Sequence, residues 1–148
     1  MGGCGWLATT LDRDMLGAGL GPEWQAERLM KRRDDPAGIE EVARELGGRM
    51  FVHYIPDYAL QSFAGREDLR WKMWVTPTPY SSEEAIDYLR LPFPHIPRRY
   101  VLLIDPRELD GPILGPKLVR QGGGSVEYLL PNGAPLKAVA EGWMVRLR

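Results

Sequence analysis

The stretch RYVLLID, residues 99–105, places four aliphatic residues in a row directly before an aspartate. Strands covered on both faces by other parts of a protein are continuously apolar, whereas strands with one face in water alternate between apolar and polar residues. The run therefore predicts a central strand that is buried on both faces, with the other hydrophobic residues of the core around it.

Other short β-type runs are separated from this one by proline and glycine residues, as is typical of strands. The expected strands are RMFVHYI (49–55), KMWVT (72–76), SVEYLL (125–130) and WMVRLR (143–148). A helix is expected within SSEEAIDYLRLP (81–92), because Ser81 and Glu84 have the spacing of a capping box and Pro92 ends the pattern. This order of elements predicts an α+β fold.

The first 48 residues have a helical pattern instead. Pro22 suits the first position of a helix over PEWQAERLMKRR (22–33). In DDPAGIEEVARELGG (34–48), Asp35 is the expected N-cap, Pro36 lies in the first turn and glycines end the helix. We therefore expect an N-terminal helical segment, residues 1–48, and a second domain, residues 49–148.

The composition of the chain argues against several broad classes of protein. Its 148 residues are 44% hydrophobic and 26% charged, which is typical of one folded domain. With 19 basic and 20 acidic residues, the net charge of −1 creates no general attraction for nucleic acid or anionic lipid. The start of the chain lacks the features of a signal peptide, and no window is apolar enough to cross a membrane. We expect a soluble protein.

Metal, thiol and P-loop chemistry are not indicated by the sequence. His53, His95 and the single cysteine, Cys4, lie in separate segments without the spacing of metal ligands. Cys4 has no histidine near it in the sequence to activate a thiolate. The glycines at 122–124 lead into a strand and not into a helix, so they do not form a phosphate-binding P-loop.

Glu127 is the most informative polar residue, because it interrupts an apolar strand directly after three glycines. A glutamate in a strand points outward to water, or is buried with a partner, or faces a cleft as a catalytic carboxylate. His53 and Tyr54 are neighbours on the first expected strand, so their side chains point to opposite faces. The aromatic residues of WVTPTPYSSEEA (74–85) pack in the core or stack on a planar heterocycle.

Taken in this order, the three segments resemble the three-part site of the ADP-ribosyltransferase superfamily, the fold of NAD-cleaving bacterial toxins. The matching positions are His53 with Tyr54, then residues 76–80, then Glu127, within residues 50–148. The resemblance implies a split β core, mixed or antiparallel, with N-terminal helices attached to it.

The stretch GPKLVRQGGGSVEYLLPNGAPLKAVAEGWMVRL, residues 115–147, is similar to NAD glycohydrolase domains of the tuberculosis necrotizing toxin family. That family has a GGG-x-Q-Y stretch, followed by a short apolar helix that here would contain Leu136 and Val139. Glu127 replaces the glutamine of that pattern, one extra residue follows the glycines, and His53 replaces an arginine. These differences leave ADP-ribosyl transfer and NAD hydrolysis both open.

The resemblance implies a role for each matched residue, with NAD as substrate and no metal. Glu127 would be catalytic, because a carboxylate stabilises the oxocarbenium-like state formed when nicotinamide leaves ribose. His53 would bind a ribose, and Tyr54 or Tyr80 would stack on nicotinamide next to Thr76. The pyrophosphate would be bound by an arginine, for which the candidates are Arg66, Arg70 and Arg120.

Two other classes of function stay open at this point. One is an RNA-cleaving toxin domain in which His53 acts as base and Glu127 as acid. The other is a non-catalytic interaction module whose helix at 22–33 binds a partner. For a toxin, the expected partners are a protein or nucleic-acid acceptor and an immunity protein, and the expected site of action is the cytoplasm after delivery in a secreted effector. The segment 1–48 would cap the domain, connect it to a longer polypeptide or bind an inhibitor.

Overall fold

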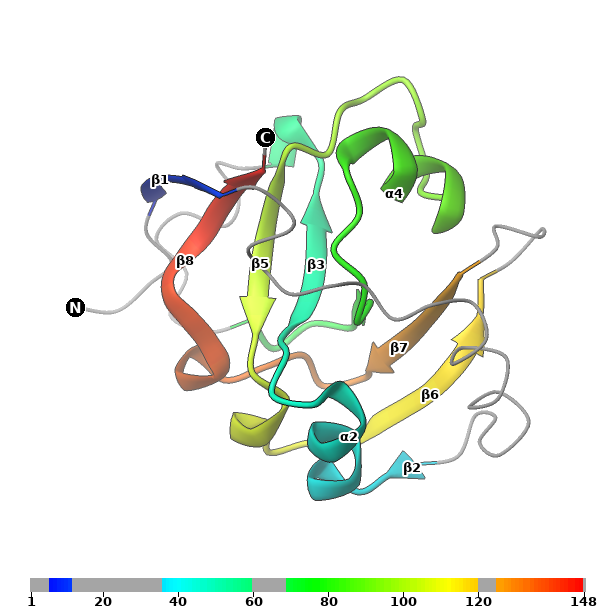
Figure 1. The fold of residues 1–148 in the computed structure, drawn as a ribbon, viewed down its shortest axis with the longest axis vertical. Helices are drawn as coiled ribbons and strands as arrows, with labels where there is room; N and C mark the ends of the chain where they lie inside the picture. Colours follow the sequence, from blue (N-terminus) through cyan, green and yellow to red (C-terminus); the bar gives the residue numbers. More distant parts are fainter. Residues whose placement is uncertain (1–5, 12–35, 60–68, 120–124, 148) are drawn as a thin grey trace.

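The computed structural model describes residues 6–11, 36–59, 69–119 and 125–147. The helix expected at 22–33 lies outside these residues, as do Cys4, Arg66, Arg120 and the glycines at 122–124. The described part has an α+β architecture with two α-helices and eight strands (Figure 1).

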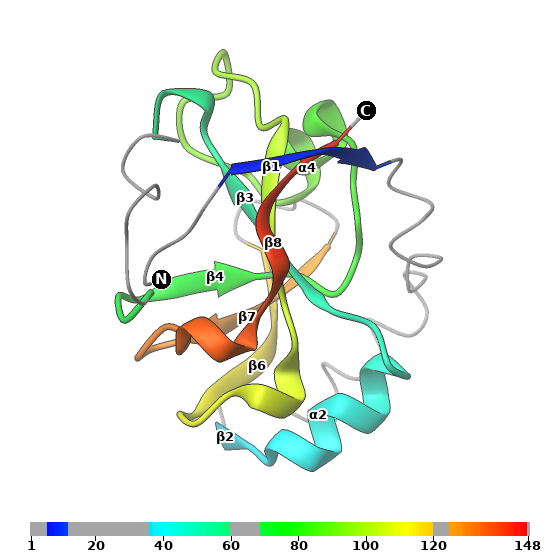
Figure 2. The ribbon, with the colours of Figure 1, turned by 90° about the vertical axis from the view of Figure 1, so that its left-hand side faces the viewer.

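The strands form two four-stranded sheets. The first sheet has the order β1-β8-β5-β3, where β1 (Trp6–Leu11) is parallel to β8 (Val139–Leu147), and β8, β5 (Tyr100–Ile104) and β3 (Phe51–Ile55) are antiparallel. Figure 2 shows β1 beside the last part of β8.

The second sheet is antiparallel and has the order β2-β6-β7-β4. Its strands are β2 (Pro36–Ala37), β6 (Ile113–Leu118), β7 (Val126–Leu130) and β4 (Met73–Val75). The two sheets meet where Val52 of β3 pairs with Thr76, the residue that follows β4. Two backbone hydrogen bonds of 2.8 and 3.0 Å join these residues in both directions.

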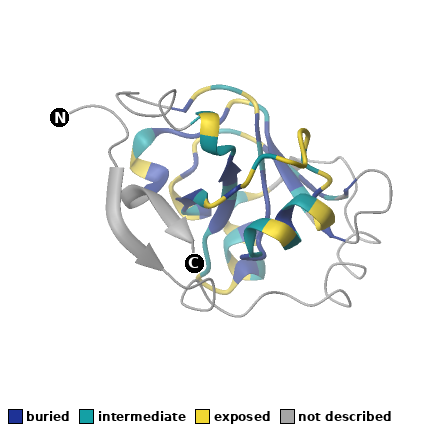
Figure 3. Cartoon of the chain, turned by 90° about the horizontal axis from the view of Figure 1, so that it is seen from above, coloured by how far each residue is buried: buried dark blue, intermediate teal, exposed yellow. Residues whose placement is uncertain are grey.

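The prediction for RYVLLID is confirmed, since β5 lies between β8 and β3 and residues 101–104 are all buried. Leu102 and Ile104 belong to the larger core cluster, which contains residues of both sheets. Val101 and Leu103 point the other way, into a smaller cluster with Ala85 on the second helix. Figure 3 shows the buried strands in the interior and the exposed positions on the helices and loops around them.

The helix at 81–92 is confirmed as α4 (Ser82–Tyr88). Ser81 accepts a hydrogen bond from the backbone N–H of Glu84, and the Glu84 carboxylate accepts one from the N–H of Ser81, which completes the capping box. The helix ends at Leu89, before Pro92.

The other predicted helix is shorter than expected. It forms α2 (Ile39–Leu46) with Gly38 as N-cap, because Pro36 is already paired with β6 in strand β2. The prediction of Asp35 as N-cap, with Pro36 in the first turn, was therefore wrong. Gly47 ends the helix in the left-handed conformation, as expected from the sequence. Val42 and Leu46 bury the inner face of α2 against the larger cluster.

Two features of the C-terminal half differ from expectation. Strand β6 was not predicted, because Gly115 and Pro116 interrupt its sequence, and the pairing with β7 shifts between Leu114 and Lys117 at this point. The apolar helix that the resemblance implied around Leu136 and Val139 is a single 3₁₀ turn, Leu136–Ala138, and Val139 already begins β8. The remaining 3₁₀ turns are Asp57–Ala59 and Pro106–Glu108. Among the described residues, no helix has the length and apolar character that a membrane span requires.

Candidate functional site

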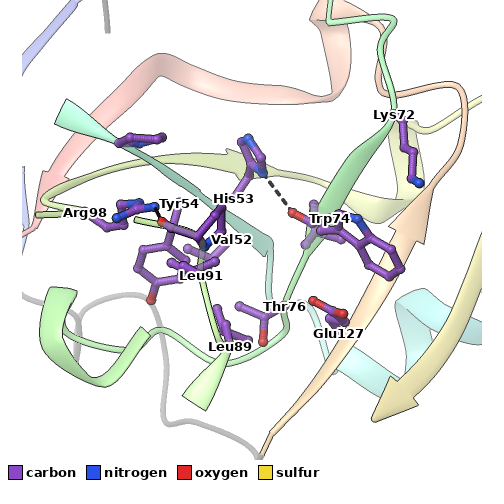
Figure 4. A pocket seen from close by; sticks show the side chains of 13 residues that line it. Val52, His53, Tyr54, Lys72, Trp74, Thr76, Leu89, Leu91, Arg98 and Glu127 are labelled. Atoms are coloured by element: carbon purple, nitrogen blue, oxygen red, sulfur yellow. Dashed lines mark hydrogen bonds between the residues drawn. The ribbon is translucent and has the colours of Figure 1, made fainter. Parts of the chain in front are cut away.

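A pocket opens at the junction of the two sheets (Figure 4). It has a volume of about 230 Å³ and adjoins a second pocket of about 400 Å³. Five residues line both pockets, so the two are parts of one hollow: Trp74, Leu89, Leu91, Pro92 and Glu127. Four of the residues expected at the site from the sequence line the first pocket: His53, Tyr54, Thr76 and Glu127.

Glu127 reaches the pocket from the second sheet. It lies on β7 directly opposite Lys117 of β6, and the side chain is partly exposed. Opposite charges at such a cross-strand position attract each other, and the carboxylate is on the face of the sheet that the pocket uses. Glu127 therefore supplies a negative charge at the wall of a cavity, and Figure 4 shows it close to Trp74 and Thr76.

Among the described lining residues, Trp74 is the aromatic one that the two pockets share. Two ammonium groups lie near its ring, with Lys72 Nζ at 5.7 Å and Lys117 Nζ at 5.5 Å from the ring centroid. These distances are within the range of cation–π attraction. From the sequence, Lys72 had no assigned role, and for the aromatic residues of 74–85, which include Trp74, core packing and stacking on a heterocycle both stayed open. Strand alternation puts residues 72, 74 and 76 on one face of KMWVT, and this period of two was the signal available in the sequence.

His53 reaches the same pocket from the first sheet. Its Nδ1 lies 2.8 Å from the carbonyl oxygen of Trp74, and because a carbonyl only accepts, Nδ1 carries the proton. Burial lowers the pKa of His53, while the hydrogen bond to Trp74 acts in the opposite direction. The ring is therefore neutral near pH 7 and has its acceptor nitrogen at Nε2.

Tyr54 and Tyr80 make contacts within the protein beside the pocket. Tyr54 is 6% exposed and donates a hydrogen bond of 2.6 Å from its hydroxyl to the carbonyl oxygen of Tyr80. The hydroxyls of Tyr80 and Ser125 lie 2.5 Å apart, and the Tyr80 ring packs on Tyr88. Of the two tyrosines expected to stack on a ligand, only Tyr54 is among the described lining residues.

The three candidate arginines have different outcomes. Arg66 and Arg120 lie outside the described residues. Arg70 forms a two-fold ion pair with Asp110, with N–O distances of 2.6 and 2.7 Å, and is not among the described pocket residues.

Positive charge dominates the lining of the hollow. The cations among the described lining residues are Lys72, Arg90 and Arg98, and the anion is Glu127. Lys117 adds a further cation opposite Glu127. The local balance thus differs from the net charge of −1 for the whole chain, and it favours an anionic ligand.

The part of the chain that the structure describes contains no cluster of histidine, cysteine, aspartate and glutamate suited to a metal ion. Comparisons of the chain with protein-family models, with curated proteins and with solved structures gave no match in any of the three. The geometry and chemistry of the pocket are therefore the basis for a functional assignment.

Proposed function

We propose that this chain binds NAD in the hollow between the two sheets and cleaves the bond between nicotinamide and ribose. The observation that carries the proposal is that Glu127 of β7 lines the same pocket as His53 and Tyr54 of β3 and Thr76 after β4. These are the residues that the resemblance to ADP-ribosyltransferases brings together, and the proposed fold is of that type.

Glu127 is the proposed catalytic residue. Loss of nicotinamide leaves positive charge on the ribose ring, and a carboxylate already in place stabilises that charge without reorganisation. Lys117 lies opposite Glu127 on β6, so a cation adjoins the carboxylate at the wall of the pocket.

The other pocket residues fit the remaining parts of a dinucleotide. The neutral His53 ring accepts a hydrogen bond from a ribose hydroxyl through Nε2, as its Nδ1 donates to Trp74. Trp74 provides a flat surface on which a heterocycle stacks, a role expected at first for a tyrosine. Lys72 and Arg90 of the lining, with Lys117 opposite Glu127, balance the pyrophosphate charge. The two adjoining pockets together fall in the size range of roughly 300–1,000 Å³ that is usual for small-molecule sites.

The test is incubation of the purified protein with NAD, with free nicotinamide followed over time. Release of nicotinamide supports the proposal, and a label on the ADP-ribose part separates its two forms. Label that stays in solution indicates hydrolysis, and label attached to added protein or nucleic acid indicates transfer to an acceptor. Intact NAD after prolonged incubation would contradict the proposal.

A second candidate is RNA cleavage with His53 as general base and Glu127 as acid. The observation that favours it is that Nδ1 donates to the Trp74 carbonyl, which leaves Nε2 as the acceptor nitrogen of a ring that lines the same pocket as Glu127. Degraded RNA beside intact NAD in the same incubation would select this candidate. A non-catalytic module would leave Glu127 facing bulk solvent, and its place on two pockets favours an enzyme instead.

A further inference from the structure

Residues 89–97, here named the wall segment, form one side of the hollow. Leu89, Leu91 and Pro92 line both pockets, and Arg90 lines the second. The segment connects the end of α4 to β5 without regular secondary structure. The shape of the binding site therefore depends on where this irregular stretch of backbone is held.

The wall segment is held by its own side chains at its start, where Leu89 is buried in the smaller core cluster and Leu91 packs against that cluster, but less so further along. Residues 92–95 are all exposed, and Phe93 has 55% of its surface in water. Arg90 and Phe93 have positive φ angles of 48° and 55°, which residues other than glycine seldom adopt. Strained backbone of this kind persists only where surrounding contacts impose it.

Arg98 supplies such contacts from inside the molecule. Its side chain is 1% exposed and lines the first pocket. The guanidinium donates hydrogen bonds to the carbonyl oxygens of Phe93, at 3.0 Å, and of Ile96 and Pro92. The backbone N–H of Arg98 donates to the Ser82 hydroxyl at 2.7 Å, which connects this network to the start of α4. A fixed fork of donors thus binds three carbonyls within the five residues 92–96.

We propose that Arg98 is a positioning residue, which holds the wall segment in place as one side of the pocket and so sets the affinity of the site for its ligand. Burying a guanidinium is unfavourable unless its donors are satisfied, and here the partners of the fork are the carbonyls of the wall segment itself. Arg98 therefore fixes the backbone of the wall segment, and the carbonyls of the segment fix the Arg98 side chain.

The effect on NAD turnover is expected in KM and not in kcat. The wall segment contributes apolar contacts, which stabilise the bound substrate and the transition state alike, and loss of such uniform binding raises KM alone. Glu127 is on β7 in the other sheet, so its position does not depend on the carbonyls that Arg98 binds. This kinetic part of the test rests on the proposed NAD cleavage.

The test compares Arg98→Met and Ser82→Ala with the parent protein. Ser82→Ala removes only the acceptor of the Arg98 N–H and so keeps the experiment decisive where Arg98→Met fails to fold. We expect Arg98→Met to raise KM by roughly 10- to 100-fold, as the loss of one or two apolar contacts with the ligand would, with kcat nearly unchanged. Ser82→Ala should act in the same direction to a smaller extent.

The matched control is Arg99→Met, since Arg99 is the next residue but is exposed and paired with Asp57. It should leave KM and kcat unchanged. Methylguanidinium added to Arg98→Ala should lower the KM of that variant towards the parent value and have no effect on Arg99→Met. An unchanged KM in folded Arg98→Met and Ser82→Ala, a fall confined to kcat, or an equal effect of Arg99→Met would overturn the proposal.

Amide hydrogen exchange gives an outcome that does not depend on any reaction. Removal of the Arg98 guanidinium should speed exchange at residues 89–97 while β5 stays protected. If the parent protein leaves NAD intact, the proposed function fails and this measurement alone decides the role of Arg98. Unchanged exchange in the wall segment would then refute it.

Discussion

The Nδ1 atom of His53 lies 2.8 Å from the carbonyl oxygen of Trp74, so a side chain of the first sheet is bonded to the backbone of the second. The backbone pairing of Val52 with Thr76 is next to it. These contacts form the junction of the sheets, and the pocket lies directly beside them.

The His53 ring should make folding stability depend on pH. Burial lowers its pKa in the folded state, so at pH values just below about 6.5 the unfolded chain binds a proton that the folded chain does not. The contribution of the neutral His53 ring to the free energy of unfolding is complete above the pKa of the unfolded chain. It is lost as the pH falls from about 6.5 towards the pKa of the folded protein. Urea denaturation of the parent and of His53→Asn across pH 5–8 should show this loss in the parent alone. The control is His95→Gln at an exposed position, and it should show the same loss as the parent because it keeps the His53 ring.

Replacing Glu127 by Gln should remove most NAD cleavage without unfolding the protein. The amide keeps the shape of the side chain but not the charge, and removal of one such electrostatic contact lowers kcat by roughly 10²- to 10³-fold. Initial rates of nicotinamide release measure the change, and thermal unfolding checks the fold. Glu108→Gln is the matched control, since Glu108 is exposed and is not among the described pocket residues. Equal rates for Glu127→Gln and the parent would rule out a catalytic carboxylate at this position.

Trp74 should contribute to ligand affinity through its ring. Loss of stacking on one base costs about 1–3 kcal/mol, so Trp74→Ala should weaken NAD binding accordingly. Trp74→Phe keeps an aromatic face and should retain most of the affinity. Isothermal titration calorimetry of the two variants measures the difference. Equal weakening in both would mean that stacking is not what Trp74 provides.

Gly133 and Gly47 form a natural pair for testing backbone strain against steric overlap, because both have a φ angle of 62°. A Cβ on Gly47 meets nothing within 4 Å, so Gly47→Ala should cost about 1 kcal/mol from the left-handed conformation alone. A Cβ on Gly133 would lie 1.8 Å from the carbonyl oxygen of Leu69 and 2.6 Å from that of Trp71.

We therefore expect Gly133→Ala to lower the free energy of unfolding by about 4 kcal/mol or more, the range of severe substitutions. The affected strand pairing is the bridge between Leu69 and Ala134, which closes this part of the second sheet against the segment before β4. Chemical denaturation of both variants gives the comparison. Similar losses for the two would show that the backbone at Gly133 moves to make room.

Elements whose signal lies in residues close together in the sequence could be predicted from it. The four aliphatic residues of β5 indicate burial on both faces, and the three-residue spacing of Ser81 and Glu84 determines where α4 begins. Strand β6 could not be recognised in the same way. Its glycine and proline are tolerated because the register with β7 shifts between Leu114 and Lys117, and a single sequence does not show a shift in pairing.

The candidate site could be predicted from the sequence only in part, for a related reason. Alternation along KMWVT was sufficient to place Trp74 beside Thr76, but the approach of Lys117 to Glu127 depends on the irregular pairing of β6. Arg98 and Arg99 are adjacent and identical in type, yet one is 1% exposed and the other faces solvent. Only the path of the chain between α4 and β5 distinguishes them.

The pocket lies where β3 of the first sheet meets the end of β4 of the second sheet. Any ligand that contacts both sides of the pocket therefore also links the two sheets. The binding free energy of such a ligand adds to the free energy of unfolding, so the melting temperature of the protein rises with the ligand concentration. A thermal-shift screen of nucleotides, sugars and short RNAs would thus identify what the hollow accepts before any reaction is assayed.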